Sequence, residues 1–207
     1  VEMNHLLPML QAVSQTDTVP FVRVPWNDPA TIMRALDLGA YGIIVPLVNT
    51  AEEAARAVAA CRYSPIGMRS VGPVRGLQYG GGDYVAHAND EIIVMAMIET
   101  AEGLANLEAI CATPGLDAVY IGPADLSLAL GLAPRADNPD PLHMETCDKI
   151  RDTAHRHGIK AVMHCAGADF AASAVKRGFD MVMLTSDLAC LMAGVRQQLE
   201  AFKSQTG

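Results

Sequence analysis

The chain has 207 residues, enough for one large domain or two small ones, and its 51% hydrophobic and 18% charged content excludes a disordered chain. Its 15 Lys and Arg against 23 Asp and Glu give a net charge of −8, which argues against a nucleic-acid-binding surface. The apolar runs, such as residues 92–98, are far shorter than the roughly 20 residues of a membrane helix. We therefore expect neither a nucleic-acid partner nor a membrane partner. Five scattered cysteines without a CxxC pair favour a cytoplasmic location over a disulfide framework or a structural zinc site.

Short β-rich runs alternate with helical stretches along the chain, which predicts parallel strands joined by crossover helices. The strands are expected at residues 21–24, 41–48, weakly at 68–71, and at 92–98, 118–121, 160–164 and 181–184. After an initial helix at 2–13, the other helices are expected at 29–38, 51–61, 101–111, 141–157, 168–177 and 188–203. A glycine follows a helix and precedes a strand four times, at Gly39, Gly115, Gly158 and Gly178. This repeated βα pattern, with no change in composition, indicates one α/β domain over residues 1–207.

The number of strands favours a (β/α)₈ TIM barrel that lacks its first strand. Seven strands are expected where a closed barrel needs eight, and the chain opens inside a helix, so the eighth should precede Val1. The alternative is a doubly wound open sheet, although no glycine-rich phosphate loop supports it.

Two acidic residues end neighbouring strands. Glu99 follows the run 92–98, and Asp125 follows 119–121 after Gly122, Pro123 and Ala124. Two converging carboxylates repel each other unless a cation lies between them, and an oxygen donor set of this size suits Mg²⁺ or Mn²⁺. The alternative is that each carboxylate only caps the helix that follows it.

Three further residues could take part in the chemistry. Arg23 lies within an apolar strand and is expected to be buried, either stabilising an oxyanion or forming a structural ion pair. Asp37 lies near a helix C-terminus, where the helix dipole disfavours its charge, so a positive group should face it unless it is solvated. His164 ends a strand and could act as an acid or base, or as a hydrogen-bonded filler.

Three motifs occur in the order and approximate spacing of a known family. Residues 22–29 (VRVPWNDP), 97–100 (MIET) and 120–127 (YIGPADLS) resemble the HpcH/HpaI class II aldolases. These are metal-dependent, pyruvate-using enzymes such as 4-hydroxy-2-oxoheptanedioate and 2-keto-3-deoxyglucarate aldolases. The resemblance extends over essentially the whole chain, with weaker support from residues 67–69 and 186–187.

The resemblance implies a role for each matching residue. Glu99 and Asp125 would ligate a divalent metal, which could be Mg²⁺, Mn²⁺ or Co²⁺, and Arg23 would stabilise the enolate oxygen of pyruvate. Asp37 would raise the basicity of a catalytic histidine, which could belong to a neighbouring subunit. The substrate would be bound by Arg23, Met97, Gly122, Pro123, Ala124 and Asp125, the amides of Ala124 and Asp125 receiving the pyruvate carboxylate.

The sequence departs from the family at two places. Met97 stands where relatives usually have a substrate-contacting glutamine. The motif carrying the family's catalytic histidine is absent, and we expect that residue to precede Val1.

The resemblance implies a lyase that reversibly cleaves a 4-hydroxy-2-oxo acid into pyruvate and an aldehyde through a pyruvate enolate. Two alternatives stay open: a non-catalytic barrel subunit lacking the general base, and a citrate-lyase or oxaloacetate-decarboxylase type of activity. Leu191, Val195, Leu199 and Phe202 form an apolar stripe on the last predicted helix. Relatives exchange such a helix between subunits, so we expect a homo-oligomer, by resemblance a hexamer.

Overall fold

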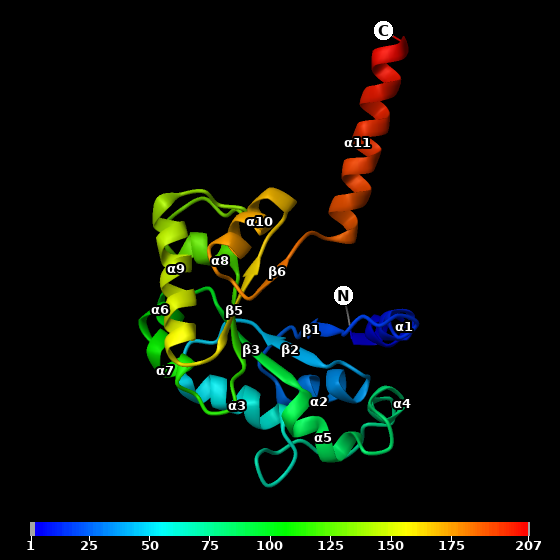
Figure 1. The fold of residues 1–207 in the computed structure, drawn as a ribbon, viewed down its shortest axis with the longest axis vertical. Coiled ribbons are helices and arrows are strands. Elements are labelled where there is room, and N and C mark those ends of the chain that lie inside the picture. The colour runs from blue at the N-terminus through cyan, green and yellow to red at the C-terminus, as the bar shows by residue number, and fades with distance from the viewer. Residues whose placement is uncertain (1–2, 207) are drawn as a thin grey trace.

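A computed structural model describes residues 3–206 and shows an α/β fold built on one curled parallel sheet (Figure 1). The six strands pair in chain order, so every crossover returns the chain to the next position in the sheet. They are β1 (Phe21–Arg23), β2 (Gly42–Val45), β3 (Ile93–Ile98), β4 (Ala118–Ile121), β5 (Lys160–His164) and β6 (Met181–Met183). Six of the seven predicted strands are thereby confirmed, in an arrangement consistent with part of a TIM barrel. A closed eight-stranded barrel does not form within residues 3–206, and the strand expected before Val1 lies outside them.

The seventh predicted strand, at residues 68–71, is wrong. Arg69 makes only a single bridge with Tyr63, and no strand of the sheet lies against this segment. Its apolar side chains Met68 and Val71 are exposed, while the charged Arg69 is buried. The segment therefore folds to bury one guanidinium, which a β-rich composition does not reveal.

The predicted helices are present with small shifts at their ends. They are α1 (Met3–Val13), α2 (Pro29–Asp37), α3 (Ala51–Cys61), α9 (Pro141–Arg156), α10 (Ala168–Lys176) and α11 (Asp187–Thr206). The helix expected at 101–111 is divided at Asn106 into α6 (Ala101–Ala105) and α7 (Leu107–Cys111). Three short helices were not predicted: α4 (Gly76–Gly80), α5 (Tyr84–Glu91) and α8 (Pro123–Ala129).

Local sequence signals fix the ends of the helices. Asp28 and Thr50 cap α2 and α3 by accepting hydrogen bonds from Thr31 N and Glu53 N. The four predicted glycine turns all have positive φ, between +76° and +109°. Gly39 is required for two reasons: its φ of +109° is unfavourable for a residue with a side chain, and a Cβ there would lie 2.4 Å from the Tyr79 ring.

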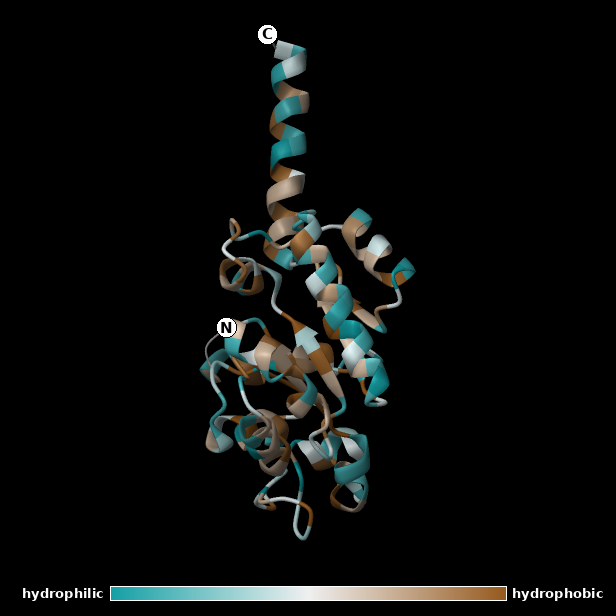
Figure 2. Ribbon diagram, turned by 90° about the vertical axis from the view of Figure 1, so that its left-hand side faces the viewer, coloured by the Kyte–Doolittle hydropathy of each residue, from teal (hydrophilic) through white to brown (hydrophobic). Residues whose placement is uncertain are grey.

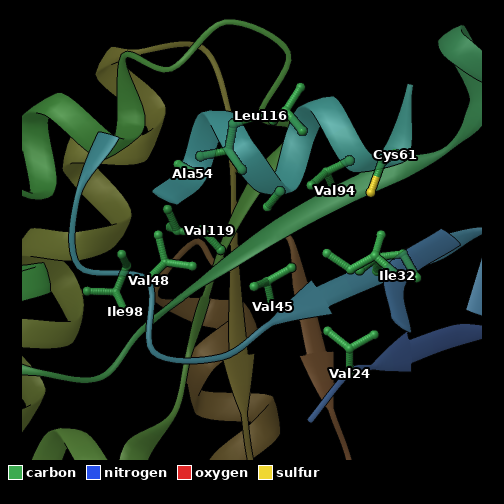
Figure 3. Close-up of a cluster of buried hydrophobic side chains, with 14 of the residues drawn as sticks. Val24, Ile32, Val45, Val48, Ala54, Cys61, Val94, Ile98, Leu116 and Val119 are labelled. Atoms are coloured by element: carbon green, nitrogen blue, oxygen red, sulfur yellow. The ribbon is translucent and has the colours of Figure 1, made fainter. Parts of the chain in front are cut away.

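The sheet separates two apolar layers. The outer layer joins the sheet to the helices: in Figure 3, Val45, Val94 and Val119 lie on the same side of the sheet as Ala54 and Cys61 of α3. The inner layer is a smaller cluster of inward-facing side chains, consisting of Ile44, Met95, Met97, Ala118, Tyr120 and Val162. These inward positions alternate along each strand and lead directly to the site at the carboxyl ends of the strands.

The last helix, α11, stands apart from the rest of the molecule. Both views show it projecting away from the sheet and its covering helices (Figures 1 and 2). None of its residues is buried, and the predicted stripe of Leu191, Val195, Leu199 and Phe202 is exposed. Within residues 3–206, no helix combines the length and apolar character that crossing a bilayer requires.

Candidate active site

A cavity of about 590 Å³ opens at the carboxyl ends of the strands. Each of the six strands, or the loop directly after it, contributes to its wall. Its lining includes Arg23, Leu47, Met97, Glu99, Tyr120, Gly122, Pro123, Ala124, Asp125, His164 and Met183. All the predicted site residues except Asp37 therefore meet in one place.

Glu99 is the most deeply buried acid of this cavity, with only 3% of its surface exposed. Its Oε1 accepts a hydrogen bond from Leu47 N at 2.8 Å, in the loop after β2. The helix that follows is capped by Thr100, whose hydroxyl accepts from Gly103 N at 2.9 Å. The capping alternative for Glu99 is therefore excluded, and its carboxylate faces the cavity instead.

Gly122 makes room for that carboxylate. A Cβ at this position would lie only 2.1 Å from Glu99 Oε2 and 3.0 Å from Met97 Cε. The second carboxylate oxygen of Glu99 thus occupies the space that a side chain at residue 122 would fill. The glycine that precedes α8 is therefore required because a side chain there would collide with Glu99.

Asp125 brings a second negative charge to the same cavity. It lies in the first turn of α8, and its side chain is exposed. Burial raises the pKa of Glu99 and the nearby Asp125 charge raises it further, while the Leu47 amide and Arg23 lower it. A cation between the two carboxylates would relieve both the burial penalty and the repulsion.

The donor set of the cavity fits a hard divalent cation. Within residues 3–206, no group of three or more His, Cys, Asp or Glu side chains is arranged to enclose a metal. Two carboxylates with solvent-accessible space around them suit an ion that keeps several positions for water and substrate oxygens. The alternative of a closed structural site does not fit this arrangement.

Arg23 reaches the cavity, but the expectation that it is buried is wrong. It ends β1, and its side chain is exposed because the strand stops where the cavity opens. Across the described part of the chain, no carboxylate lies within ion-pair distance of its guanidinium. The Arg23 guanidinium is therefore available to bind a ligand, and the alternative of a structural ion pair is excluded.

Asp37 lies elsewhere in the molecule. At the end of α2 it accepts a hydrogen bond from Arg69 Nη2 at 3.0 Å, and the Arg69 side chain is fully buried. The guanidinium also stacks on the Tyr63 ring, 4.5 Å from its centroid. A positive group thus faces Asp37, as its unfavourable place in the helix dipole predicted.

Two features of the cavity were missed from the sequence. The Tyr120 hydroxyl lies 2.9 Å from His164 Nδ1, which joins β4 to the end of β5. Leu47 has a φ of +54°, unusual for a residue with a side chain, and this conformation accompanies the amide hydrogen bond to Glu99. Period-two alternation through Gly122 would have placed Tyr120 inward, but nothing in the sequence signals the backbone conformation of Leu47.

Comparisons with known proteins agree with this geometry. The model of the HpcH/HpaI aldolase/citrate lyase family matches residues 1–193. A hydroxypyruvate/pyruvate aldolase of Rhizorhabdus wittichii is 43% identical over 198 residues, covering 95% of this chain and 78% of that protein. A 5-keto-4-deoxy-D-glucarate aldolase of Salmonella arizonae is 36% identical over 204 residues, covering 98% and 79%. A crystal structure from Burkholderia cenocepacia, described as an HpcH/HpaI aldolase/citrate lyase family protein, superposes with a TM-score of 0.87 at 28% identity, covering 98% and 81%.

Proposed function

The chain belongs to the HpcH/HpaI aldolase/citrate lyase family and is a class II aldolase, and we propose that it reversibly cleaves a 4-hydroxy-2-oxo acid into pyruvate and an aldehyde. The observation that carries the proposal is the orientation of Glu99. One of its oxygens is fixed by Leu47 N and the other lies over Gly122, in a cavity shared with Asp125 and Arg23.

Glu99 and Asp125 are the residues that would hold a divalent cation, for which Mg²⁺, Mn²⁺ and Co²⁺ are the candidates. When bound, such an ion supplies Lewis-acid stabilisation of negative charge on the 2-oxo group. The contribution of this chain is to keep both carboxylates at one wall of the cavity and to leave the remaining space to substrate.

The other lining residues bind and orient the 2-oxo acid. The amides of Ala124 and Asp125 lie in the first turn of α8, where backbone N–H groups lack helical partners, and would donate to the pyruvate carboxylate. Gly122, Pro123 and Met97 form the adjoining wall. Because Met97 is apolar, this wall provides no side-chain hydrogen bond at that position.

Arg23 acts on the charge that develops during cleavage. As the C3–C4 bond breaks, its electron pair moves to form the enolate. The C4 hydroxyl passes its proton to a general base, which by family resemblance is a histidine, as the aldehyde forms. The guanidinium of Arg23 lines the cavity without an ion-pair partner in the described residues and would stabilise the growing enolate oxygen. The enolate then takes a proton at C3 to give pyruvate.

Assembly and location belong to the same proposal. The exposed stripe of α11 is suited to packing against another subunit, and we propose a homo-oligomer, by family resemblance a hexamer, in the cytoplasm. In such an assembly Asp37 would act on the catalytic histidine of a neighbouring subunit. The partners of the active site are then the small-molecule 2-oxo acid and the aldehyde.

The test is to incubate the protein with oxaloacetate or a 4-hydroxy-2-oxo acid and Mg²⁺, Mn²⁺ or Co²⁺, and to follow pyruvate release. The proposal predicts release from both substrates, abolished by a chelator. Metal-dependent decarboxylation of oxaloacetate without aldol turnover would indicate an enolate site that lacks its base. No pyruvate release with any metal would favour a non-catalytic subunit.

A further inference from the structure

The strand register places His164 on the same level of the cavity as Glu99. Ile98 pairs with Ile121, and Ile121 pairs with Met163, so the following residues Glu99, Gly122 and His164 form one row. Gly122 carries no side chain, and the space beside it is entered by Glu99 Oε2 itself, so no third side chain of the row separates the acid from the imidazole. Two strand spacings separate their main chains by about 10 Å. A ligand anchored beside Glu99 could extend along this row to His164.

Tyr120 lies one level below and holds the imidazole. Its hydroxyl is 2.9 Å from His164 Nδ1 and 3.8 Å from Met183 Sδ. Burial raises the pKa of Tyr120 to about 12, so the phenol keeps its proton. Burial also lowers the pKa of His164, against the opposing charge of Asp137, and favours the neutral ring.

These contacts select one tautomer of His164. An imidazole nitrogen is a much better acceptor than a thioether sulfur, so the Tyr120 O–H donates to Nδ1. A neutral ring that accepts at Nδ1 carries its proton on Nε2. Within the described residues, Nε2 has no hydrogen-bond partner in the protein, and Phe21, Ile44, Met97 and Met183 make much of the surrounding wall apolar. An N–H donor in such a wall calls for an oxygen on the ligand.

We propose that His164, positioned by Tyr120, donates a hydrogen bond from Nε2 to a hydroxyl oxygen on the aldehyde portion of the substrate. This inference rests on the proposed function, which anchors the 2-oxo acid portion at Glu99 and Asp125. The hydrogen bond from His164, held in place by Tyr120, would make the enzyme prefer α-hydroxyaldehydes over aldehydes that lack the hydroxyl. His164 is then the residue that contacts substrate, and Tyr120 is a positioning residue.

The experiment compares glycolaldehyde with acetaldehyde as acceptors for pyruvate in the presence of Mn²⁺, using the ratio of the two kcat/KM values. In His164→Leu the ratio should fall at least about tenfold, because the buried hydroxyl loses its donor. His164→Gln, which can still present an amide N–H, should keep the ratio within about threefold, and Tyr120→Phe should lie between. His87→Leu, the same change at an exposed histidine outside the cavity, should leave the ratio unaltered.

An unchanged ratio in His164→Leu, or an equal loss for both aldehydes, would overturn the inference. Should His164→Leu fail to fold, the same criterion applies to Tyr120→Phe, which retains the buried ring and removes only the hydroxyl that positions His164. A readout independent of turnover is the ¹⁵N NMR signature of the imidazole. It should report the Nε2–H tautomer in the unaltered protein and a tautomer mixture in Tyr120→Phe, and an Nδ1–H tautomer in the unaltered protein would contradict the proposal.

The proposed function can fail separately from this inference. If the unaltered protein releases no pyruvate from oxaloacetate with any metal, the enolate site itself is absent and both proposals are wrong. If it does release pyruvate but the aldehyde ratio is insensitive to His164, only the hydroxyl-binding role is wrong.

Discussion

At the scale of single residues, the site depends on how the Glu99 carboxylate is held. Its two oxygens have different surroundings: Leu47 N fixes Oε1, whereas Oε2 lies in the space left by Gly122. Burial and the neighbouring Asp125 both disfavour its charge. The charge of Glu99 therefore destabilises the metal-free fold, and it is needed only to bind a cation. A substitution that removes the charge tests both statements.

Glu99→Gln should abolish activity and stabilise the metal-free protein. Because the pKa of Glu99 is raised above 4.5, the folded state binds its proton more tightly than the unfolded state, and stability falls as pH rises from that value. Glutamine removes this loss, so the variant should gain in melting temperature relative to the unaltered protein as pH rises. kcat/KM should fall at least about 100-fold.

The measurement is thermal unfolding in EDTA across about pH 4 to 8. If the difference in melting temperature between Glu99→Gln and the unaltered protein did not change with pH, the raised pKa of Glu99 would be wrong. Mn²⁺ at about 100 times its Kd should stabilise the unaltered protein by about 2.7 kcal/mol, and it should stabilise Glu99→Gln far less.

Gly122→Ala should separate folding from function. The added Cβ meets the movable end of the Glu99 side chain, so the fold can adapt by displacing the carboxylate, while the site cannot. We expect a melting temperature within a few degrees of the unaltered protein and a loss in kcat/KM of at least about tenfold. The matched control is Gly82→Ala, where a Cβ meets nothing within 4 Å and φ is not positive. Equal kcat/KM values for Gly122→Ala and Gly82→Ala would show that catalysis does not depend on the position of the Glu99 carboxylate.

The sequence indicated the residues at the ends of strands but not their surroundings. Glu99 was identifiable because it directly follows a buried run, and Asp125 because it follows the next run after Gly122, Pro123 and Ala124. The exposure of Arg23 was not predictable, since it depends on β1 ending where the cavity opens. The pairing of Tyr120 with His164 depends on register between β4 and β5, which a single sequence does not give.

At the scale of elements, one ion pair connects α2 with the segment that follows α3. Arg69 is enclosed by the Tyr63 and Tyr84 rings and donates to Asp37 at the end of α2. The segment at 68–71 was predicted as a strand because its composition is β-rich. Its conformation is instead held by tertiary contacts: Met68 N donates to Ala59 O, Arg69 N donates to Arg62 O, and the Arg69 side chain is buried. The alternation of strands and helices elsewhere was predictable, because glycine turns and caps are encoded locally.

Asp37→Asn should therefore destabilise the fold. It leaves the fully buried Arg69 charge without its anion, and we expect a loss of about 3 kcal/mol in the free energy of unfolding, measured in urea. Glu108→Gln, which breaks the pairs of the exposed Glu108 carboxylate with Arg156 and His157, is the control and should change stability little. If the two variants lowered the free energy of unfolding equally little, Asp37 would have no structural role, and only its proposed action on a neighbouring subunit would remain.

At the scale of the whole molecule, the unusual feature is a 20-residue helix with an apolar stripe and no buried residue. Singly exposed apolar side chains are common, but Leu188, Leu191, Val195, Leu199 and Phe202 lie along one helix that contacts little else. The stripe was predictable from its spacing. Its exposure was not, because spacing alone does not say which surface covers a stripe.

A charged pair of substitutions on this stripe, Val195→Asp with Leu199→Asp, should shift the protein toward monomers. The two carboxylates would be desolvated in any interface that buries the stripe. Gln197→Asp, on the polar side of the same helix, should leave the assembly intact. Sedimentation velocity at about micromolar concentration distinguishes the outcomes, and an unaltered protein that sediments as a monomer would refute the proposed oligomer.

The proposed function depends above all on a divalent cation held by Glu99 and Asp125 beside the substrate. The most direct measurement is an anomalous difference map from crystals grown with Mn²⁺ and pyruvate. We predict one strong peak bonded to both carboxylates, with pyruvate oxygens and water in the remaining positions and the pyruvate carboxylate beside the amides of Ala124 and Asp125. A peak that touches neither acid, or pyruvate bound in the cavity without any metal, would contradict it.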